Sequence, residues 1–143
     1  EMYALLYGAS FHLGTGTKSI LFHLLRTEGV AYSYYVDYDV VEDTAYLEVV
    51  VESARSLEET RRAVEEALKP REPPPYRLKF YDYVWRVEWR NAASRALTVA
   101  DYVAKGGRPE GIEEAFRRAA ERGTAWIRPH MVDEAEAVLT QKL

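Results

Sequence analysis

The chain has 143 residues, enough for one domain with a substantial buried core, and 48% of them are hydrophobic while 29% are charged. No cysteine is present, which excludes disulfide bonds, thiolate catalysis and cysteine-ligated metal centres. No apolar run approaches the roughly 20 residues that cross a bilayer, and no secretory signal is recognisable, so we expect a cytoplasmic protein without a membrane span.

Charge is unevenly distributed along the chain. Residues 1–68 carry 5 basic and 12 acidic side chains, whereas residues 69–143 carry 14 and 11. A basic second half is typical of a chain that meets phosphate groups or an acidic partner, although interleaved charges on exposed helices produce the same asymmetry. One asparagine, one glutamine and 14 arginines against 5 lysines indicate a thermophilic source.

The first elements surround a glycine-rich loop. Residues 2–11 alternate between two sets of side chains and predict a strand, whereas apolar residues at helical spacing over 20–25 predict a helix that ends at Gly29. The loop, GTGTKS at 14–19, has the lysine and hydroxyl of a Walker A motif, but Thr17 stands where that motif requires glycine. We therefore expect a turn and helix cap there rather than nucleotide hydrolysis.

A weaker function for this loop stays open. Backbone amides at the start of a helix hold anions, and hydroxyl and ammonium groups beside them add donors. The side chains that would bind a phosphate or carboxylate in this way are Lys18, Thr15, Thr17 and Ser19.

The middle of the chain predicts a hairpin followed by a helix. Residues 30–41 and 44–53 are rich in β-branched and aromatic residues, as expected for two antiparallel strands. Ser56 followed by Glu59 is a capping-box pattern, and it predicts a helix that ends before Pro70.

The second half begins with a proline-rich segment. REPPPYRL, residues 71–78, predicts a stiff connector, and residues 76–90 alternate as expected for a fourth strand. Asn91 is suited to cap a helix that ends near Gly106. The pattern then predicts a helix from Pro109 to Gly123, a short edge strand over 124–128 and a final helix over 130–143.

The element order over residues 2–90 is therefore β-α-β-β-α-β. This order predicts an α+β fold of the ferredoxin-like type, in which one four-stranded antiparallel sheet is covered by two helices. Residues 91–143 would form a mainly helical C-terminal extension, so that residues 1–143 make a single domain.

Aromatic residues are the most unusual feature, with 18 in the chain and 11 of them tyrosine. Alternate residues of the predicted fourth strand would place rings and cations on one open sheet face. Such a face binds single-stranded RNA by stacking bases and pairing phosphates, although residues 44–51 lack the signature of the RNA recognition motif. The residues expected to contact nucleic acid are Arg77, Lys79, Tyr81, Tyr83, Trp85, Arg86 and Arg90.

Other chemical constellations are incomplete. The three histidines, His12, His23 and His130, lack the spacing of a metal site. The carboxylates of the hairpin, Asp37, Asp39, Glu48 and Glu52, fit a solvated strand face better than a cation site. The arginines of residues 109–123 could face DNA in a helix-turn-helix, but their spacing from glutamates favours ion pairs within one helix. These arginines are Arg117, Arg118 and Arg122.

The leading hypothesis is a non-catalytic binding or assembly subunit with RNA as its ligand and no cofactor. One alternative is a self-associating protein-interaction module whose aromatic sheet face is buried, because large aromatic patches rarely stay bare. The other is a small enzyme that uses the glycine turn at 14–19, with His12, Lys18 and either Asp37 or Asp39 as its reacting groups.

Overall fold

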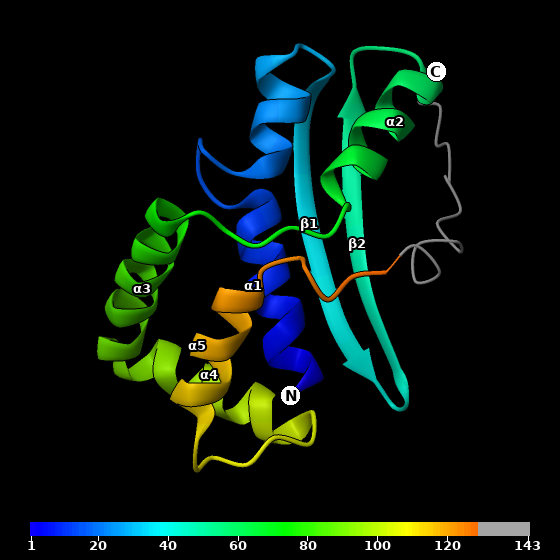
Figure 1. Ribbon diagram of the computed structural model, residues 1–143. Coiled ribbons are helices and arrows are strands. Elements are labelled where there is room, and N and C mark those ends of the chain that lie inside the picture. Colours follow the sequence, from blue (N-terminus) through cyan, green and yellow to red (C-terminus); the bar gives the residue numbers. More distant parts are fainter. Residues whose placement is uncertain (129–143) are drawn as a thin grey trace.

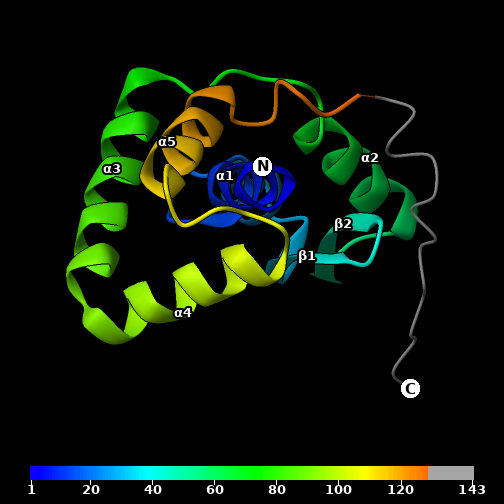
Figure 2. The same ribbon diagram turned by 90° about the horizontal axis from the view of Figure 1, so that it is seen from below.

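The computed structural model describes residues 1–128, in which helices and one β-hairpin surround a central helix, α1 (Met2–Gly14). The view along α1 shows that helix enclosed by its neighbours (Figure 2). Figure 1 shows the hairpin and α2 on one side of α1, and α3, α4 and α5 on the other. After α1 the elements are the π-helix η1 (Phe22–Thr27), β1 (Ala31–Val41), β2 (Thr44–Ser53), α2 (Leu57–Ala67), α3 (Pro75–Arg90), α4 (Ala92–Ala104) and α5 (Ile112–Arg122).

The ferredoxin-like prediction is wrong. The sheet of residues 1–128 has two strands, β1 and β2, and the segments predicted as the first and fourth strands are the helices α1 and α3. The described residues therefore form a mixed α and β structure in which helix packing, not a four-stranded sheet, supplies most of the core.

Helix α1 was mistaken for a strand because it has no polar face. It is buried on several sides, with Leu6, Ala9 and Leu13 all at most 2% exposed. A helix enclosed all round loses the 3.6-residue alternation of apolar and polar side chains by which surface helices are recognised. An apolar run of this kind fits a strand and a buried helix equally well.

The hairpin and α2 confirm the predictions for residues 30–67. In β1 and β2, Val36 pairs with Val49 and Tyr38 with Leu47, and this face packs on the core near α1. Ser56 caps α2 as expected, because its hydroxyl accepts a hydrogen bond from the Glu59 amide at 3.2 Å.

The second half is partly as predicted. Pro75 occupies the first turn of α3, where a missing amide hydrogen costs nothing, so the helix begins inside the predicted connector. Asn91 caps α4 as expected by accepting a hydrogen bond from the Ser94 amide at 3.0 Å. Residues 124–128 form turns and irregular backbone instead of a strand, and the predicted helix over 130–143 lies outside the described residues.

Helices α1 and α5 approach each other unusually closely at Gly8. A methyl group on Gly8 would lie 2.8 Å from the Ala119 carbonyl oxygen, closer than real Cβ contacts allow. The absence of a side chain therefore lets the two backbones touch. Among the described residues, no helix is long and apolar enough to span a bilayer.

Candidate functional site

Helix α3 divides the residues of the predicted RNA-binding face between two sides. On a strand, alternate residues share a face, but on a helix residues share a face at intervals of three or four. Three of the predicted residues therefore turn toward the core: Arg77, Tyr81 and Trp85. Four turn outward and are exposed or nearly so: Lys79, Tyr83, Arg86 and Arg90.

Tyr81 and Trp85 are core residues rather than ligand contacts. Tyr81 is 4% exposed, and its hydroxyl donates a hydrogen bond to the Phe116 carbonyl at 3.0 Å. Burial raises the pKa of Tyr81 well above its ordinary value. Trp85 stacks on Phe116 with ring centroids 4.8 Å apart, so both aromatic rings hold α3 against α5.

Arg77 ties the start of α3 to the end of α1. Its Nη2 donates hydrogen bonds to the carbonyl oxygens of Phe11 and Thr15, each at 2.9 Å. The Phe11 carbonyl also accepts a hydrogen bond from the Thr15 amide at 3.0 Å. Carbonyls at the C-terminus of a helix carry partial negative charge, so a cation there stabilises them. Burial lowers the pKa of Arg77, whose guanidinium also lies 5.3 Å from the centre of the Phe80 ring.

The outward side of α3 forms a stripe of alternating aromatic and basic side chains, which we call the α3 outer face. Its members recur at intervals of three or four along about 21 Å of helix and are Tyr76, Lys79, Tyr83, Arg86 and Arg90. Tyr83 is 66% exposed and does not pack against the hydrophobic core. Lys18 extends the stripe, because its Nζ lies 5.5 Å from the centre of the Tyr76 ring.

One acidic residue interrupts this positive surface. Asp82 forms an ion pair with Arg86, in which Oδ2 lies 2.9 Å from Nη2, and both side chains are more than half exposed. An exposed pair of this kind contributes at most about 1 kcal/mol, so a phosphate can compete for the arginine.

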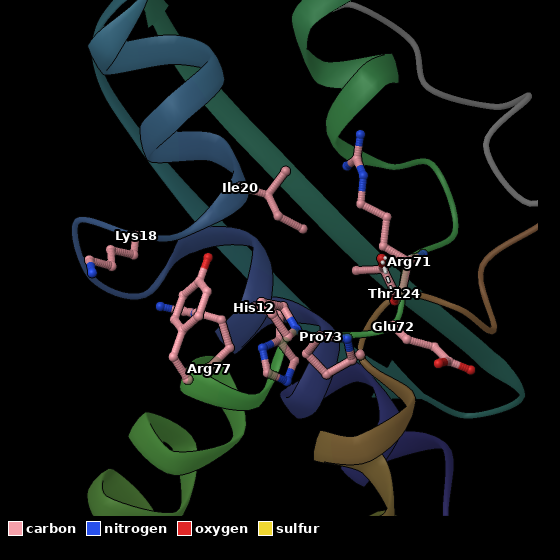
Figure 3. Close-up of a pocket in the computed structure, with 11 residues that line it drawn as sticks. His12, Lys18, Ile20, Arg71, Glu72, Pro73, Arg77 and Thr124 are labelled. Atoms are coloured by element: carbon pink, nitrogen blue, oxygen red, sulfur yellow. Dashed lines mark hydrogen bonds between the residues drawn. The ribbon is translucent and has the colours of Figure 1, made fainter.

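A small pocket lies at the N-terminal end of this face (Figure 3). Its volume is about 90 Å³, room for several water molecules or one small ion. The side chains that give it chemical character are His12, Lys18, Arg71, Glu72, Arg77 and Thr124. They come from α1, the loop after it, the segment before α3, the first turn of α3 and the segment after α5.

His12 is neutral inside this pocket. It is 3% exposed, and burial lowers its pKa to about 4. Its Nε2 lies 2.9 Å from the Ala120 carbonyl oxygen, which can only accept, so Nε2 carries the proton. The other ring nitrogen, Nδ1, is buried without a hydrogen-bond partner among the described residues. In Figure 3 the ring lies between Arg77 and Pro73.

Thr124 fixes the far wall of the pocket. Its amide donates a hydrogen bond to the Arg71 carbonyl at 3.1 Å, and its hydroxyl accepts one from the Arg71 amide at 3.2 Å. These bonds join segments 53 residues apart in the chain. Sequence reasoning missed Arg71, Glu72 and Thr124, because no local pattern signals a contact between two irregular segments.

The loop at 14–19 contributes only one of its four predicted anion ligands to the pocket. Lys18 lines it, whereas the Ser19 hydroxyl is within 3.1 Å of the Tyr34 hydroxyl and accepts a hydrogen bond from the Phe22 amide. Thr15 ends α1 and uses its carbonyl to hold Arg77, and Thr17 is exposed outside the pocket. The helix cap, expected from Thr15 or Thr17, is therefore formed by Ser19 instead.

The predicted enzyme residues come together only in part. His12 and Lys18 share the pocket, but its carboxylate is Glu72 and not Asp37 or Asp39. Asp39 instead forms an ion pair with Lys105, whose Nζ lies 2.8 Å from Oδ1. The hydrogen bond from Lys105 lowers the pKa of the Asp39 carboxyl group. Asp37 and Glu48 face each other across the hairpin, and in residues 1–128 no cluster of three such side chains is arranged to hold a metal ion.

Two of the three arginines of α5 are engaged within their own helix, whereas Arg122 forms no ion pair with another described residue. Arg117 forms ion pairs with Glu114 and Glu121, and Arg118 pairs with Glu114. This arrangement is typical of a solvated helix face and does not favour the reading of DNA.

Comparison with known proteins identifies no similar protein. No family model, no curated protein and no solved structure matches the chain. Its function must therefore be inferred from its own geometry.

Proposed function

We propose that the protein is a non-catalytic binding subunit whose α3 outer face binds single-stranded RNA. The observation that carries this proposal is the stripe on which two exposed tyrosines alternate with three basic side chains at helical spacing. Cations that track a backbone, combined with rings on which bases stack, are the usual parts of a single-strand binding surface.

The overall charge of −4 does not oppose this function. Phosphate binding depends on local clusters of lysine and arginine, because the field of more distant charges is screened beyond about 8–10 Å at physiological salt. Lys18, Lys79, Arg86 and Arg90 supply four positive charges near α3. The carboxylates near them are Asp82, which pairs with Arg86, and Glu72, which lines the same pocket as Lys18; Glu88 is a further carboxylate on α3.

Binding should depend strongly on salt and on Arg86. We expect a fluorescein-labelled single-stranded oligoribonucleotide to bind with a slope of log K against log salt of about −3, as for four phosphate contacts on a single strand. Arg86→Ala should reduce the magnitude of that slope by about 0.7, and Tyr83→Ala should cost about 1–3 kcal/mol of binding free energy by removing a stacking surface. Fluorescence anisotropy at several salt concentrations measures both effects.

Arg62 provides the matched control. It is an exposed arginine on α2 with an i, i+4 carboxylate partner, as Arg86 is on α3, but it lies outside the outer face. Arg62→Ala should leave the affinity unchanged, and an equal loss in the two variants, or binding insensitive to salt, would contradict the proposal. A DNA strand of the same sequence tests whether the 2′-hydroxyl contributes.

Self-association is a second candidate, but on a different surface from the one predicted. Tyr81 and Trp85, two of the aromatic residues that motivated it, pack within the core, whereas α4 presents an exposed apolar stripe. Its members recur at the spacing of a coiled-coil seam and are Ala93, Leu97, Ala100 and Ala104. Leu97 is 67% exposed, more than any other large hydrophobic side chain in residues 1–128.

A second copy of the chain would cover this stripe, since two such helices can pack closely. Light scattering should then give twice the monomer mass of 16.4 kDa. Leu97→Glu should restore the monomer by burying an unpaired charge at the interface, whereas Val87→Glu, an exposed site on α3, should not. A monomeric parent protein would remove this candidate without affecting the RNA proposal.

A further inference from the structure

The pocket at the end of the α3 outer face has more positive than negative charge. Three cations line it, Lys18, Arg71 and Arg77, together with one carboxylate, Glu72. Arg71 is neutralised by Glu66, whose carboxylate lies 2.9 Å from its guanidinium. Lys18 and Arg77 form no ion pair with any carboxylate of the described part of the chain.

Arg77 is a buried cation without a carboxylate partner among the described residues. It is 4% exposed, and charges buried to that degree are ordinarily paired with an opposite charge because their desolvation is costly. Its two hydrogen bonds to α1 carbonyls use Nη2 alone. Within residues 1–128, Nε and Nη1 of Arg77 have no hydrogen-bond partner, so a guanidinium with free donors lies on the pocket wall.

His12 adds an unused acceptor to these donors. Its Nδ1 is buried and unpartnered, and since Nε2 holds the proton, Nδ1 presents a lone pair. A buried polar atom without a partner costs about 1–3 kcal/mol, so such atoms are rare in proteins and are completed by a water molecule, an ion or a ligand. An anion that also carries a hydroxyl group would pair with the free donors of Arg77 and donate a hydrogen bond to Nδ1 of His12.

We propose that this pocket binds a phosphate group. A hydrogen phosphate has oxygens that accept hydrogen bonds from Lys18 and Arg77, and it has an O–H that can donate to Nδ1 of His12. The volume of about 90 Å³ suits a single phosphate group rather than a whole nucleotide. This site adjoins the N-terminal end of the α3 outer face, where Tyr76 and Lys18 border both, and the group could belong to inorganic phosphate or to a phosphorylated end of a nucleic acid.

Inorganic phosphate is the first probe. Amide and His12 ring resonances of the full chain should shift saturably when phosphate is added, within a range up to about 10 mM, in which even a 1 mM site would be nine-tenths filled. Lys18→Ala should weaken binding about tenfold, because it removes a charged hydrogen bond and leaves the core intact. Lys105→Ala removes the same charge beside Asp39, outside the pocket, and should have no effect.

Two further arms test the chemistry of the site. Sulfate has the size and charge of phosphate but no O–H at neutral pH, so it should bind about fivefold more weakly if Nδ1 accepts a hydrogen bond. Glu72→Gln removes the carboxylate that opposes the anion and should tighten phosphate binding about threefold. An increase in affinity cannot result from a damaged fold.

Oligoribonucleotides distinguish the two sources of the group. If a nucleic-acid end occupies the pocket, a 5′- or 3′-phosphorylated strand should bind more tightly than the same strand with a hydroxyl end, and Lys18→Ala should abolish the difference. Saturable binding of inorganic phosphate alone, with no such difference, identifies free phosphate as the ligand. No saturable shift with phosphate, or a shift unaffected by Lys18→Ala, overturns the proposal even if the α3 outer face binds RNA.

Discussion

Replacing Phe116 with alanine is expected to lower the free energy of unfolding by about 3–5 kcal/mol. Phe116 is 0% exposed and lies where α5 meets α1, α3 and α4. Its ring centroid is 5.1 Å from that of Tyr7 and 5.6 Å from that of Tyr102, in addition to the Trp85 stack. Alanine would leave a cavity that three helices cannot fill without moving.

Guanidinium unfolding, followed by tryptophan fluorescence, measures this loss. Phe22→Ala is the matched control, because Phe22 is only partly buried and does not pack against the buried hydrophobic residues of the core. Its loss should be smaller by at least about 1 kcal/mol. Equal losses in the two variants would mean that Phe116 does not organise the helical core.

How far the fold can be predicted depends on how distinctive each local pattern is. The hairpin at 31–53 alternates apolar and acidic residues on opposite faces, and Ser56 with Glu59 marks a helix start, so both were predicted. Residues 76–90 fit both periods, because tyrosine, tryptophan and arginine have apolar and polar parts and satisfy either template. The length of the run was the better guide, since fifteen residues far exceed a usual strand of about 5–6.

The predicted site residues were redistributed because the segment that carries them is a helix and not a strand. Lys79, Tyr83, Arg86 and Arg90 stay together on the surface because spacings of four, three and four residues share a helix face. Arg77, Tyr81 and Trp85 move inside for the same reason. The pocket could not be foreseen beyond His12 and Lys18, because Arg71 and Thr124 meet only through tertiary contact.

The second large effect expected is a loss of stability in mild acid caused by His12. In the folded protein burial lowers the pKa of His12 to about 4, from an ordinary value of 6.5 that we take for the unfolded chain. Between these values the unfolded chain binds the proton more readily, so the free energy of unfolding falls as the pH falls. The contribution of His12 to the free energy of unfolding is therefore greatest above pH 6.5. The free energy of unfolding should decrease by about 2–3 kcal/mol between pH 7.5 and pH 4.5.

The surroundings of His12 support this direction. Arg77 adds electrostatic repulsion to the effect of burial, and the Ala120 carbonyl offers a single opposing hydrogen bond. Lys18 and Glu72 line the same pocket with opposite charges. The carboxylates with the clearest ion pairs have pKa values below their ordinary 3.8 or 4.5, so their contribution to the free energy of unfolding is lost at lower pH. They are Asp39, Glu66 and Glu114. The change in stability between pH 7.5 and pH 4.5 is therefore assigned mainly to His12.

Guanidinium unfolding at half-unit steps of pH tests the prediction, with His12→Gln as the comparison. Glutamine can still donate to the Ala120 carbonyl but cannot become charged, so the variant should lose most of the dependence between pH 6.5 and pH 4.5 even if it is less stable at neutral pH. An unchanged pH dependence in His12→Gln would show that His12 is not the group responsible. A reduced one would establish that the pocket holds a neutral imidazole, whose free Nδ1 is the acceptor on which phosphate recognition depends.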